Sequence, residues 1–308
     1  IDIDGNDYID LTMGFGCHVL GHAHPVVVEA VDEQIKLGLQ FGIHSIHQHP
    51  LGRLLIDASP CAEQVMFCNS GTEATLYAIR AARAFSGKSG LAMFQGSYHG
   101  AHDSVLMSID RNHKEDTRAA PVGGGIPLSL VEHTHILPYL DESAFDIIRE
   151  NADKLAAVII EPIQGSNPTL SVGEFLSNLH QVCEESSVVL IFDEVITGFR
   201  VAYGGGQELF DVTPHLATYG KALGGGAPIG AVAGRKDIMQ CFNWNSDRNT
   251  ATKIFTGGTF GGNPLSMVAG RAQVEYLRDN QEIYETLASH GQKISDEIGV
   301  FAENKGLP

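Results

Sequence analysis

The sequence predicts an α/β protein with a central, mostly parallel β-sheet flanked by helices. Continuous aliphatic and β-branched runs, such as Ala156–Ile160 and Val188–Phe192, are typical of strands buried on both faces. A helix is expected at Glu174–Glu185 between these two runs, and the strand–helix–strand order favours parallel pairing. The composition, with 43% hydrophobic and 19% charged residues over 308 positions, indicates a globular protein rather than a disordered one.

The elements follow one another in a regular order. Residues 1–45 are expected to form a lead-in segment, with Asp4-Gly5-Asn6 turning between two short strands. The polar stretch 111–135, which contains three consecutive glycines, is expected to be one long loop. The remaining expected elements are a strand at Val65–Cys68, a helix at Glu73–Phe85, a strand at Leu91–Phe94, a weaker strand at Ile229–Ala233 and a helix at Pro264–Asp279.

The charge of the chain limits its partners. It has 20 Lys and Arg against 37 Asp and Glu, which gives a net charge of −17. Nucleic acids and anionic membranes bind clustered positive charge, so we expect neither as a partner. The five scattered cysteines contain no C-x-x-C pair and indicate a reducing compartment, the cytoplasm. No apolar run approaches the ~18 residues that would span a membrane.

The segment from Asn69 to Glu73 reads Asn-Ser-Gly-Thr-Glu and joins an expected strand to an expected helix. The free N–H groups at a helix start attract anions, and Gly71 lets the backbone approach a ligand closely, so the segment can bind a phosphate. Alternatively, Ser70 caps the helix and Glu73 completes a capping box. Taken alone, the segment favours the cap.

Two carboxylates, Asp193 and Glu194, follow the buried run Val188–Phe192. A carboxylate at such a place needs a cationic partner, because burial alone would neutralise it. Nucleotide triphosphatases hold magnesium with a similar segment, but they also need a glycine-rich phosphate loop. The nearest match, Gly87-Lys88-Ser89, has Ala82 where the first glycine is required, which excludes that class.

Two further segments carry residues suited to a flat, reactive ligand. Lys221 stands among small residues, and a lysine in a tight, partly desolvated site can lose its proton and form a Schiff base. A surface lysine in a flexible turn is the alternative. Tyr98, after the expected strand Leu91–Phe94, can stack on a planar ring or simply pack. Together, a phosphate cradle, a carboxylate, an imine-forming lysine and a stacking ring are what pyridoxal 5′-phosphate requires.

The sequence then resembles the class III pyridoxal-phosphate aminotransferases of fold type I. The resemblance rests on seven motifs in order: LGHAHP (20–25), NSGTEA (69–74), GSYHG (96–100), EPIQG (161–165), FDEVITGFR (192–200), YGKALGGGAPIGA (219–231) and GGTFGGNP (257–264). Within the family, the sequence most resembles the glutamate-1-semialdehyde 2,1-aminomutase branch and the β-aminotransferase domains of biosynthetic assembly lines.

The resemblance implies a seven-stranded, mostly parallel sheet, an additional small domain, and amino-group transfer between an amine donor and a carbonyl acceptor. An intramolecular 2,1-aminomutase, a pyridoxal-phosphate epimerase and a non-catalytic domain of the same fold remain alternatives.

The resemblance also assigns residues to the cofactor. They are Lys221 for the aldehyde and proton transfer, Asp193 for the pyridine nitrogen, Val195 and Tyr98 for the two ring faces, Ser70, Gly71 and Thr72 for the phosphate, and Glu161 and His99 within the same pocket. Thr259 is expected to reach the phosphate of a neighbouring subunit, which implies a homodimer.

Some features depart from the family pattern. Ser166 follows the EPIQG motif, where the ornithine and 4-aminobutyrate branches have a glutamate that switches between substrates, so no such switch is expected. Family chains also begin upstream of Ile1 and continue past Pro308. We therefore expect a fragment with an N-terminal segment (1–45), a large cofactor-binding domain (46–270) and the incomplete beginning of a small domain (271–308).

Other polar residues have less definite roles. His44, His47 and His49 could hold a metal, although contacts in a pocket or between subunits are favoured. Arg200 could bind a substrate carboxylate through its planar guanidinium group or form a structural ion pair.

Overall fold

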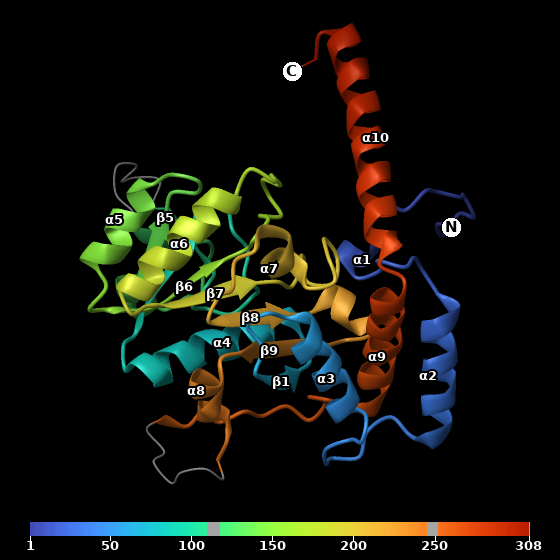
Figure 1. Ribbon diagram of the computed structural model, residues 1–308, viewed down its shortest axis with the longest axis horizontal. Helices are drawn as coiled ribbons and strands as arrows, with labels where there is room; N and C mark the ends of the chain where they lie inside the picture. The colour runs from blue at the N-terminus through green and yellow to red at the C-terminus, as the bar shows by residue number, and fades with distance from the viewer. Residues whose placement is uncertain (110–117, 245–251, 308) are drawn as a thin grey trace.

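The computed structural model describes residues 1–109, 118–244 and 252–307, and it contains a seven-stranded sheet in the order β1-β9-β8-β7-β6-β2-β5 (Figure 1). The strands are β1 (Gln64–Cys68), β2 (Gly90–Phe94), β5 (Thr134–Leu137), β6 (Leu155–Ile160), β7 (Val189–Asp193), β8 (Leu216–Tyr219) and β9 (Gly230–Gly234). Strands β5, β2, β6, β7 and β8 pair in parallel, whereas β9 runs antiparallel to both β8 and β1. The predicted α/β class with a mostly parallel seven-stranded sheet is confirmed.

Helices cover both faces of this sheet (Figure 1). The longer ones are α2 (Pro25–Leu37), α3 (Gln48–Ala58), α4 (Gly71–Ser86), α5 (Ser143–Glu150), α6 (Gly173–Glu185), α9 (Pro264–Asp279) and α10 (Glu282–Lys305). Shorter helical segments are α1 (Met13–Gly16), α7 (Gly205–Phe210), α8 (Lys236–Met239), and the 3₁₀ turns η1 (Leu128–His133), η2 (Lys221–Gly224) and η3 (Gln240–Phe242).

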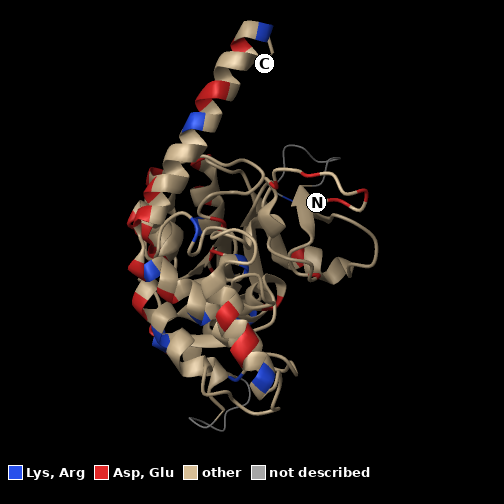
Figure 2. Cartoon of the chain, turned by 90° about the vertical axis from the view of Figure 1, so that its right-hand side faces the viewer, with Lys and Arg blue, Asp and Glu red and all other residues tan. Residues whose placement is uncertain are grey.

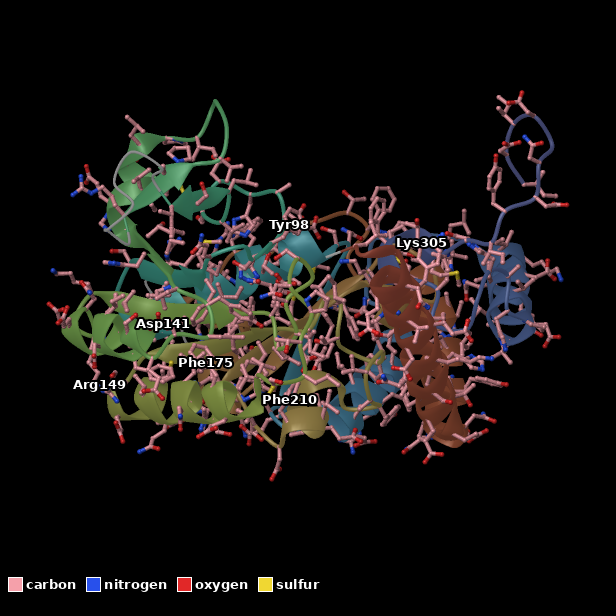
Figure 3. All side chains as sticks on the ribbon, turned by 90° about the horizontal axis from the view of Figure 1, so that it is seen from above. Tyr98, Asp141, Arg149, Phe175, Phe210 and Lys305 are labelled. Carbon is pink, nitrogen blue, oxygen red and sulfur yellow. The ribbon has the colours of Figure 1, made fainter. Side chains whose placement is uncertain are left out.

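Alternate side chains of the same strand enter different hydrophobic cores. In β2, Leu91 and Met93 pack with α4, whereas Ala92 and Phe94 pack with α5 and α6. Helices α5 and α6 lie side by side (Figure 3), and the ring of Phe175 stacks on that of Phe145 at 5.0 Å. Because both faces are covered, the central strands are continuously apolar, which is why the sequence identified them.

The lead-in segment differs from its prediction. The turn at Asp4-Gly5-Asn6 is present, with Gly5 N–H donating to the carbonyl of Asp2 at 3.1 Å, but no strand flanks it. The Asp2 carboxylate accepts from the N–H groups of Asp4 and Asn6, both at 2.9 Å, so the side chain satisfies the local backbone donors. Ile3 is fully exposed, which leaves no buried face to support a hairpin.

The long loop expected at residues 111–135 is also wrong in part. Residues 110–117 lie outside the described structure, but β4 (Ala119–Pro121) pairs with β3 (Met107–Ile109), and η1 leads directly into β5. These elements are three to six residues long, too short to produce a periodic pattern. They are stabilised instead by tertiary contacts, since Ala119 and Ile136 are buried in the core beneath α4.

Helix α10 extends away from the body of the molecule (Figures 1 and 2). None of its residues is buried, and its charged side chains are mostly acidic (Figure 2). Only its first turn contacts the body, where Ile283 and Tyr284 pack on the core formed by α3 and α9. Within the described residues, no helix is both long and apolar enough to cross a membrane.

Candidate active site

A cavity of about 190 Å³ lies at the carboxyl ends of the parallel strands, the edge where open α/β sheets place their ligands. Segments that follow β2, β6, β7 and β8 meet there with the first turn of α4. The lining residues are Ser70, Gly71, Thr72, Thr75, Tyr98, His99, Gly100, Glu161, Asp193, Val195, Ile196 and Lys221. They include nine of the ten residues that the sequence analysis assigned to the cofactor.

The first turn of α4 forms one end of the cavity. Ser70 Oγ accepts from Glu73 N–H at 3.2 Å, and Glu73 Oε2 accepts from Asn69 N–H at 2.6 Å, so the helix is capped as the alternative interpretation expected. The cap does not exclude a ligand, because the N–H groups of Gly71 and Thr72 in the first turn have no intrahelical acceptor. The segment can therefore be a cap and a phosphate cradle at once.

Glycine keeps this end of the cavity open. A Cβ atom on Gly100, whose φ is +100°, would lie 2.8 Å from the Cα atom of Thr72. A Cβ on Gly71 would lie 2.8 Å from Cγ1 of Val195. The backbone at Gly100 and the side chain of Val195 thus approach the start of α4 more closely than larger residues at positions 100 and 71 would allow.

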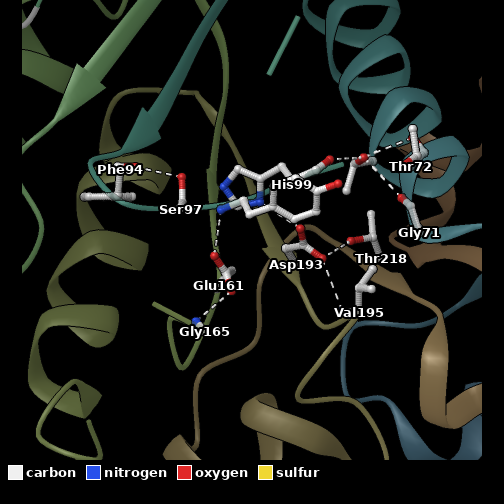
Figure 4. A network of polar contacts seen from close by, with 12 residues as sticks. Gly71, Thr72, Phe94, Ser97, His99, Glu161, Gly165, Asp193, Val195 and Thr218 are labelled. Atoms are coloured by element: carbon white, nitrogen blue, oxygen red, sulfur yellow. Dashed lines mark hydrogen bonds and ion pairs between the residues drawn. The ribbon is translucent and has the colours of Figure 1, made fainter. Parts of the chain in front are cut away.

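Asp193 is held by three partners in the floor of the cavity (Figure 4). Its Oδ1 accepts from Thr218 Oγ1 at 3.0 Å and from Val195 N–H at 3.2 Å, while Oδ2 accepts from His99 Nδ1 at 2.7 Å. The side chain of Asp193 is 4% exposed and that of His99 0%. The buried carboxylate of Asp193 thus has the ring of His99 as a close hydrogen-bonding partner.

His99 has a second, unused ring nitrogen. Its Nε2 is buried without a hydrogen-bond partner within the described residues. The imidazole of His99 therefore interacts with Asp193 through Nδ1. The carboxylate of Asp193 lines the cavity and can still accept a hydrogen bond from a protonated nitrogen of a ligand. This is the donor–acceptor arrangement that a protonated pyridine ring requires.

Glu161 fixes the loop that carries Tyr98. Its Oε1 accepts from Tyr98 N–H and its Oε2 from Gly165 N–H, both at 2.9 Å (Figure 4). Burial raises the pKa of Glu161, and the two backbone donors partly offset that rise. Both carboxylate oxygens thus accept hydrogen bonds from the backbone, so Glu161 holds the segment that carries Tyr98.

Ser166 joins the same two loops. Its hydroxyl donates to the carbonyl of Gly96 at 2.7 Å, and Gln164 Nε2 donates to the carbonyl of Gln95 at 2.9 Å. The residue that departs from the family pattern therefore binds the neighbouring loop.

Lys221 begins the turn η2 and is separated from the end of β8 by Gly220 alone. Its φ of +42° lies in the left-handed region, which is rare for a residue with a side chain. Such conformations persist where the surrounding structure holds them, and they are frequent in active sites. Tyr98, 64% exposed, covers the open side of the cavity that Lys221 lines.

Other residues singled out from the sequence lie elsewhere. Thr259 does not line the cavity, and its carbonyl accepts a hydrogen bond from Gln40 Nε2. His44 Nδ1 contacts Gln48 Oε1 at 2.7 Å, and no group of three or more potential metal ligands converges within the described chain. Arg200 Nη2 donates to the carbonyl of Gly16 at 2.7 Å, and no ion pair of Arg200 is present among the described residues.

The sequence analysis missed Thr218, which binds Asp193. The signal was present but indirect: Thr218 pairs with Asp193 in the register of β7 and β8, and β8 itself was not predicted. It also missed Thr75, whose hydroxyl donates to the carbonyl of His99 at 2.6 Å and so fixes the segment that carries this histidine.

Comparisons with known proteins agree with this geometry. Residues 1–305 match the class-III aminotransferase family. The chain is 42% identical over 308 residues to glutamate-1-semialdehyde 2,1-aminomutase of Methanocaldococcus jannaschii, covering 99% of this chain and 70% of that protein. It is 43% identical over 277 residues to the Methanothermobacter thermautotrophicus protein of the same name, covering 89% of this chain and 64% of that protein. The chain thus spans about two thirds of the length of these relatives.

Solved structures give the same result. The structure is similar to an omega-transaminase from Sphaerobacter thermophilus, with a TM-score of 0.92 and 35% sequence identity over 100% of this chain and 70% of that one. It is also similar to a β-phenylalanine aminotransferase from Variovorax paradoxus, with a TM-score of 0.75 and 31% identity over 88% of this chain and 58% of that one.

Proposed function

The chain belongs to the class-III aminotransferase family of pyridoxal-phosphate-dependent enzymes, and on this premise we propose that it transfers an amino group from an amine or amino-acid donor to a carbonyl acceptor. The observation that carries the proposal is the meeting of Lys221, the Asp193–His99 pair and the start of α4 in one cavity. These are the residue types that the cofactor needs at its aldehyde, at its pyridine nitrogen and at its phosphate, respectively.

Each end of the cofactor has a matching group in the cavity. The N–H groups of Gly71 and Thr72 would bind the phosphate, and the Asp193 carboxylate would keep a proton on the pyridine nitrogen. Tyr98 and Val195 would lie against the two faces of the ring. When bound, pyridoxal phosphate supplies an electron sink that stabilises negative charge at the carbon of the donor.

Lys221 is the residue placed to move the proton. Lys221 lines the cavity from the turn that follows β8. Its amine can therefore remove the proton from the donor carbon and return it after the transfer. The buried floor, in which Asp193 is 4% exposed, excludes water from beneath the ring and strengthens these electrostatic interactions.

A half-reaction assay tests the proposal. The purified chain is saturated with pyridoxal phosphate, and conversion of the bound cofactor to its amine form is followed by absorbance with a panel of amine donors. We expect conversion with at least one donor and its loss in Lys221→Ala. Lys88→Ala is the matched control, because Lys88 Nζ donates to the carbonyl of Ala152 outside the cavity. Failure of the wild-type chain to bind the cofactor would exclude the function.

An intramolecular aminomutase is the second candidate, because the curated relatives described above carry that name. Supplying glutamate 1-semialdehyde alone separates the two. If the amino group moves from carbon 2 to carbon 1 without any other acceptor, the chain is an aminomutase. If product forms only when a separate donor and acceptor are supplied, it is an aminotransferase. Inversion at the donor carbon without loss of nitrogen would instead indicate an epimerase, and binding without any turnover a non-catalytic domain.

The proposal includes a homodimer in which Thr259 of one subunit reaches the phosphate in the other. It is supported by the position of Thr259 outside its own cavity. Mixing Lys221→Ala and Thr259→Ala subunits should restore activity, because one site of each hybrid then contains both native residues. Activity no greater than the sum of the separate variants would contradict the shared site.

The proposed organisation keeps the segments 1–45, 46–270 and 271–308 as the lead-in, the cofactor-binding domain and the beginning of a small domain. We also propose a cytoplasmic location. All five cysteines are free, and four of them are buried, which suits a reducing compartment.

A further inference from the structure

A second carboxylate, Glu194, follows Asp193 but does not line the cavity. It is completely buried, and its oxygens accept from Thr197 Oγ1, from Gly206 N–H at 2.9 Å, and from the backbone and side-chain N–H groups of Gln207 at 3.0 and 3.3 Å. All four donors are neutral, and Glu194 forms no ion pair in the described parts of the chain. The cationic partner expected from the sequence is therefore absent here, and hydrogen bonds replace it.

Gln207 extends this network to the strand that carries the lysine. Its Nε2 donates to the hydroxyl of Tyr219 at 2.9 Å, and that hydroxyl donates to Ser59 Oγ at 2.7 Å. Gln207 Oε1 accepts from Cys61 N–H at 3.1 Å. The network thus connects the end of β7, the start of α7, the last residue of β8 and the segment after α3.

Glycine residues pack closely against both ends of this hydrogen-bond network. A Cβ atom on Gly205, whose φ is +73°, would lie 2.6 Å from Glu194 Oε2. A Cβ on Gly198 would lie 2.7 Å from the ring of Tyr219. Glycine backbone thus lies close against both Glu194 and Tyr219, and the hydrogen bonds of Gln207 with these two residues connect β7 with β8.

The two ends of the network are next to the two groups that do the chemistry. Glu194 follows Asp193, and Tyr219 precedes Lys221 by two residues. Lys221 has the left-handed backbone described above, which persists only when its surroundings hold it. On the other side, Leu223 N–H donates to the carbonyl of Gly220 at 2.9 Å. The anchored Tyr219 and this turn together fix the lysine.

We propose that Glu194, Gln207 and Tyr219 are positioning residues that keep the amine of Lys221 at a fixed position relative to the carboxylate of Asp193. The inference rests on the proposed function, since it concerns the placement of the reacting amine. None of the three touches the cavity, so their effect is transmitted through the backbone of β7 and β8.

Tyr219→Phe tests the proposal by removing one hydroxyl while the ring remains. Tyr203→Phe is the matched control: the rings of Tyr219 and Tyr203 both contact Phe199, at 6.0 and 5.7 Å, but the buried hydroxyl of Tyr203 has no hydrogen-bond partner among the described residues. Each variant is saturated with pyridoxal phosphate. We measure visible circular dichroism per bound cofactor, which reports how rigidly the cofactor is oriented, and the rate and donor KM of the half-reaction.

We expect Tyr219→Phe to lower the half-reaction rate about tenfold with donor KM changed less than about twofold, the pattern of a lost transition-state interaction. Its visible dichroism per cofactor should fall, whereas Tyr203→Phe should match the wild type in all three measurements. Equal dichroism and equal rates in the two variants would overturn the proposal, even if Tyr219→Phe is less stable.

Glu194→Gln provides the second variant. Its amide would place a donor against the four donors that now meet the carboxylate, so it should show the same loss of dichroism and rate, more strongly. If it does not fold, Tyr219→Phe still decides the question. A wild-type chain that binds no cofactor would refute the proposed function, whereas a wild type with normal dichroism and an unaffected Tyr219→Phe would refute only the positioning network.

Discussion

At the level of single residues, Asp193 determines the charge of the cavity floor. Replacing Asp193 by Asn keeps an acceptor for the Thr218 hydroxyl but removes the negative charge that His99 now faces. We expect Asp193→Asn to retain pyridoxal phosphate, because the phosphate cradle of α4 is unchanged. The half-reaction should slow by about 100-fold or more, as for loss of a preorganised charge.

Cofactor absorbance and half-reaction rates, measured on the same samples, check this prediction. Asp141→Asn serves as the control, because Asp141 is exposed and caps the start of α5 away from the cavity. A wild-type rate in Asp193→Asn would mean that the pyridine nitrogen needs no carboxylate.

The roles of individual residues were predictable to different degrees. Asp193 could be identified because it follows a predicted apolar strand, and Lys221 because it stands among small residues; both lie within recognisable motifs. The hydrogen bonds of Glu161 and Ser166 could not, because they join loops that are 63 and 70 positions apart in sequence. Such pairings depend on strand order, which a local pattern does not contain.

At the level of elements, the cap of α4 combines stability with binding. Ser70→Ala removes the side-chain acceptor for Glu73 N–H and should reduce the free energy of unfolding by about 1 kcal/mol. It should also weaken cofactor binding several-fold, since the first turn that bears Gly71 and Thr72 loses its anchor. Thermal unfolding with and without pyridoxal phosphate measures both effects.

Ser70→Thr supplies the control for the cap, because threonine also caps helices. It should recover most of the lost stability and binding. Equal melting temperatures for Ser70→Ala and the wild type would show that the hydroxyl contributes nothing.

The pairing of β7 with β8 includes a histidine side chain. Leu190 N–H donates to His215 Nδ1 at 2.8 Å, and His215 Nε2 lies 2.7 Å from Glu184 Oε1. Burial lowers the pKa of His215 below its ordinary value of 6.5, and Arg235 and His180 add to the decrease, although Glu184 opposes it. Protonation at Nδ1 would remove the acceptor for Leu190, so the folded state favours the neutral ring.

A lowered pKa in the folded state has a definite consequence for stability. The unfolded chain takes up the proton first as the pH falls through 6.5, so the free energy of unfolding should decrease below that pH. His102, whose pKa burial lowers to about 4, acts in the same direction over a wider range. While either group titrates, the loss approaches about 1.4 kcal/mol per pH unit.

Unfolding in urea between pH 5 and 8 tests this expectation. His215→Gln should be less stable than the wild type at pH 8 but should lose less stability between pH 7 and 5. An identical pH dependence in the variant would assign the effect to other groups.

Whole elements were predicted where burial left a continuous signal. The runs in β6 and β7 and the helix α9 were identified nearly to the residue, because both faces of these strands are apolar and Pro264 marks the helix start. Strand β8 was missed because it has only four residues and is followed at once by Gly220. The short strands within 111–135 were also missed because they have only three or four residues, and their pairing depends on partners that are distant in sequence.

At the level of the whole molecule, stability should depend on the layer between α4 and the sheet. Ile159 in β6 is 0% exposed and belongs to the core beneath α4. Ile159→Ala should therefore reduce the free energy of unfolding by about 2–5 kcal/mol, and Ile159→Val by only about 0.5–1.5 kcal/mol. Urea unfolding of the three proteins gives the comparison, and equal losses in both variants would contradict a tightly packed layer.

The overall architecture was predictable because alternating strands and helices leave few arrangements once crossovers are right-handed and both faces are covered. The antiparallel strand β9 was predicted as a strand, but its direction was not, since direction depends on the route of the chain after Lys221. The order of the sheet likewise follows from long-range pairing.

That order has a consequence for how the molecule assembles as it is synthesised. Strand β1 lies at the edge and joins the sheet through β9, with Gln64 paired to Gly234. During translation β1 therefore remains unpaired until β9, which ends at Gly234, has left the ribosome, and contacts of such sequence separation form slowly. Because α4 begins three residues after β1, the proposed phosphate cradle becomes fixed late, and nascent chains that end before Gly234 should not capture the cofactor.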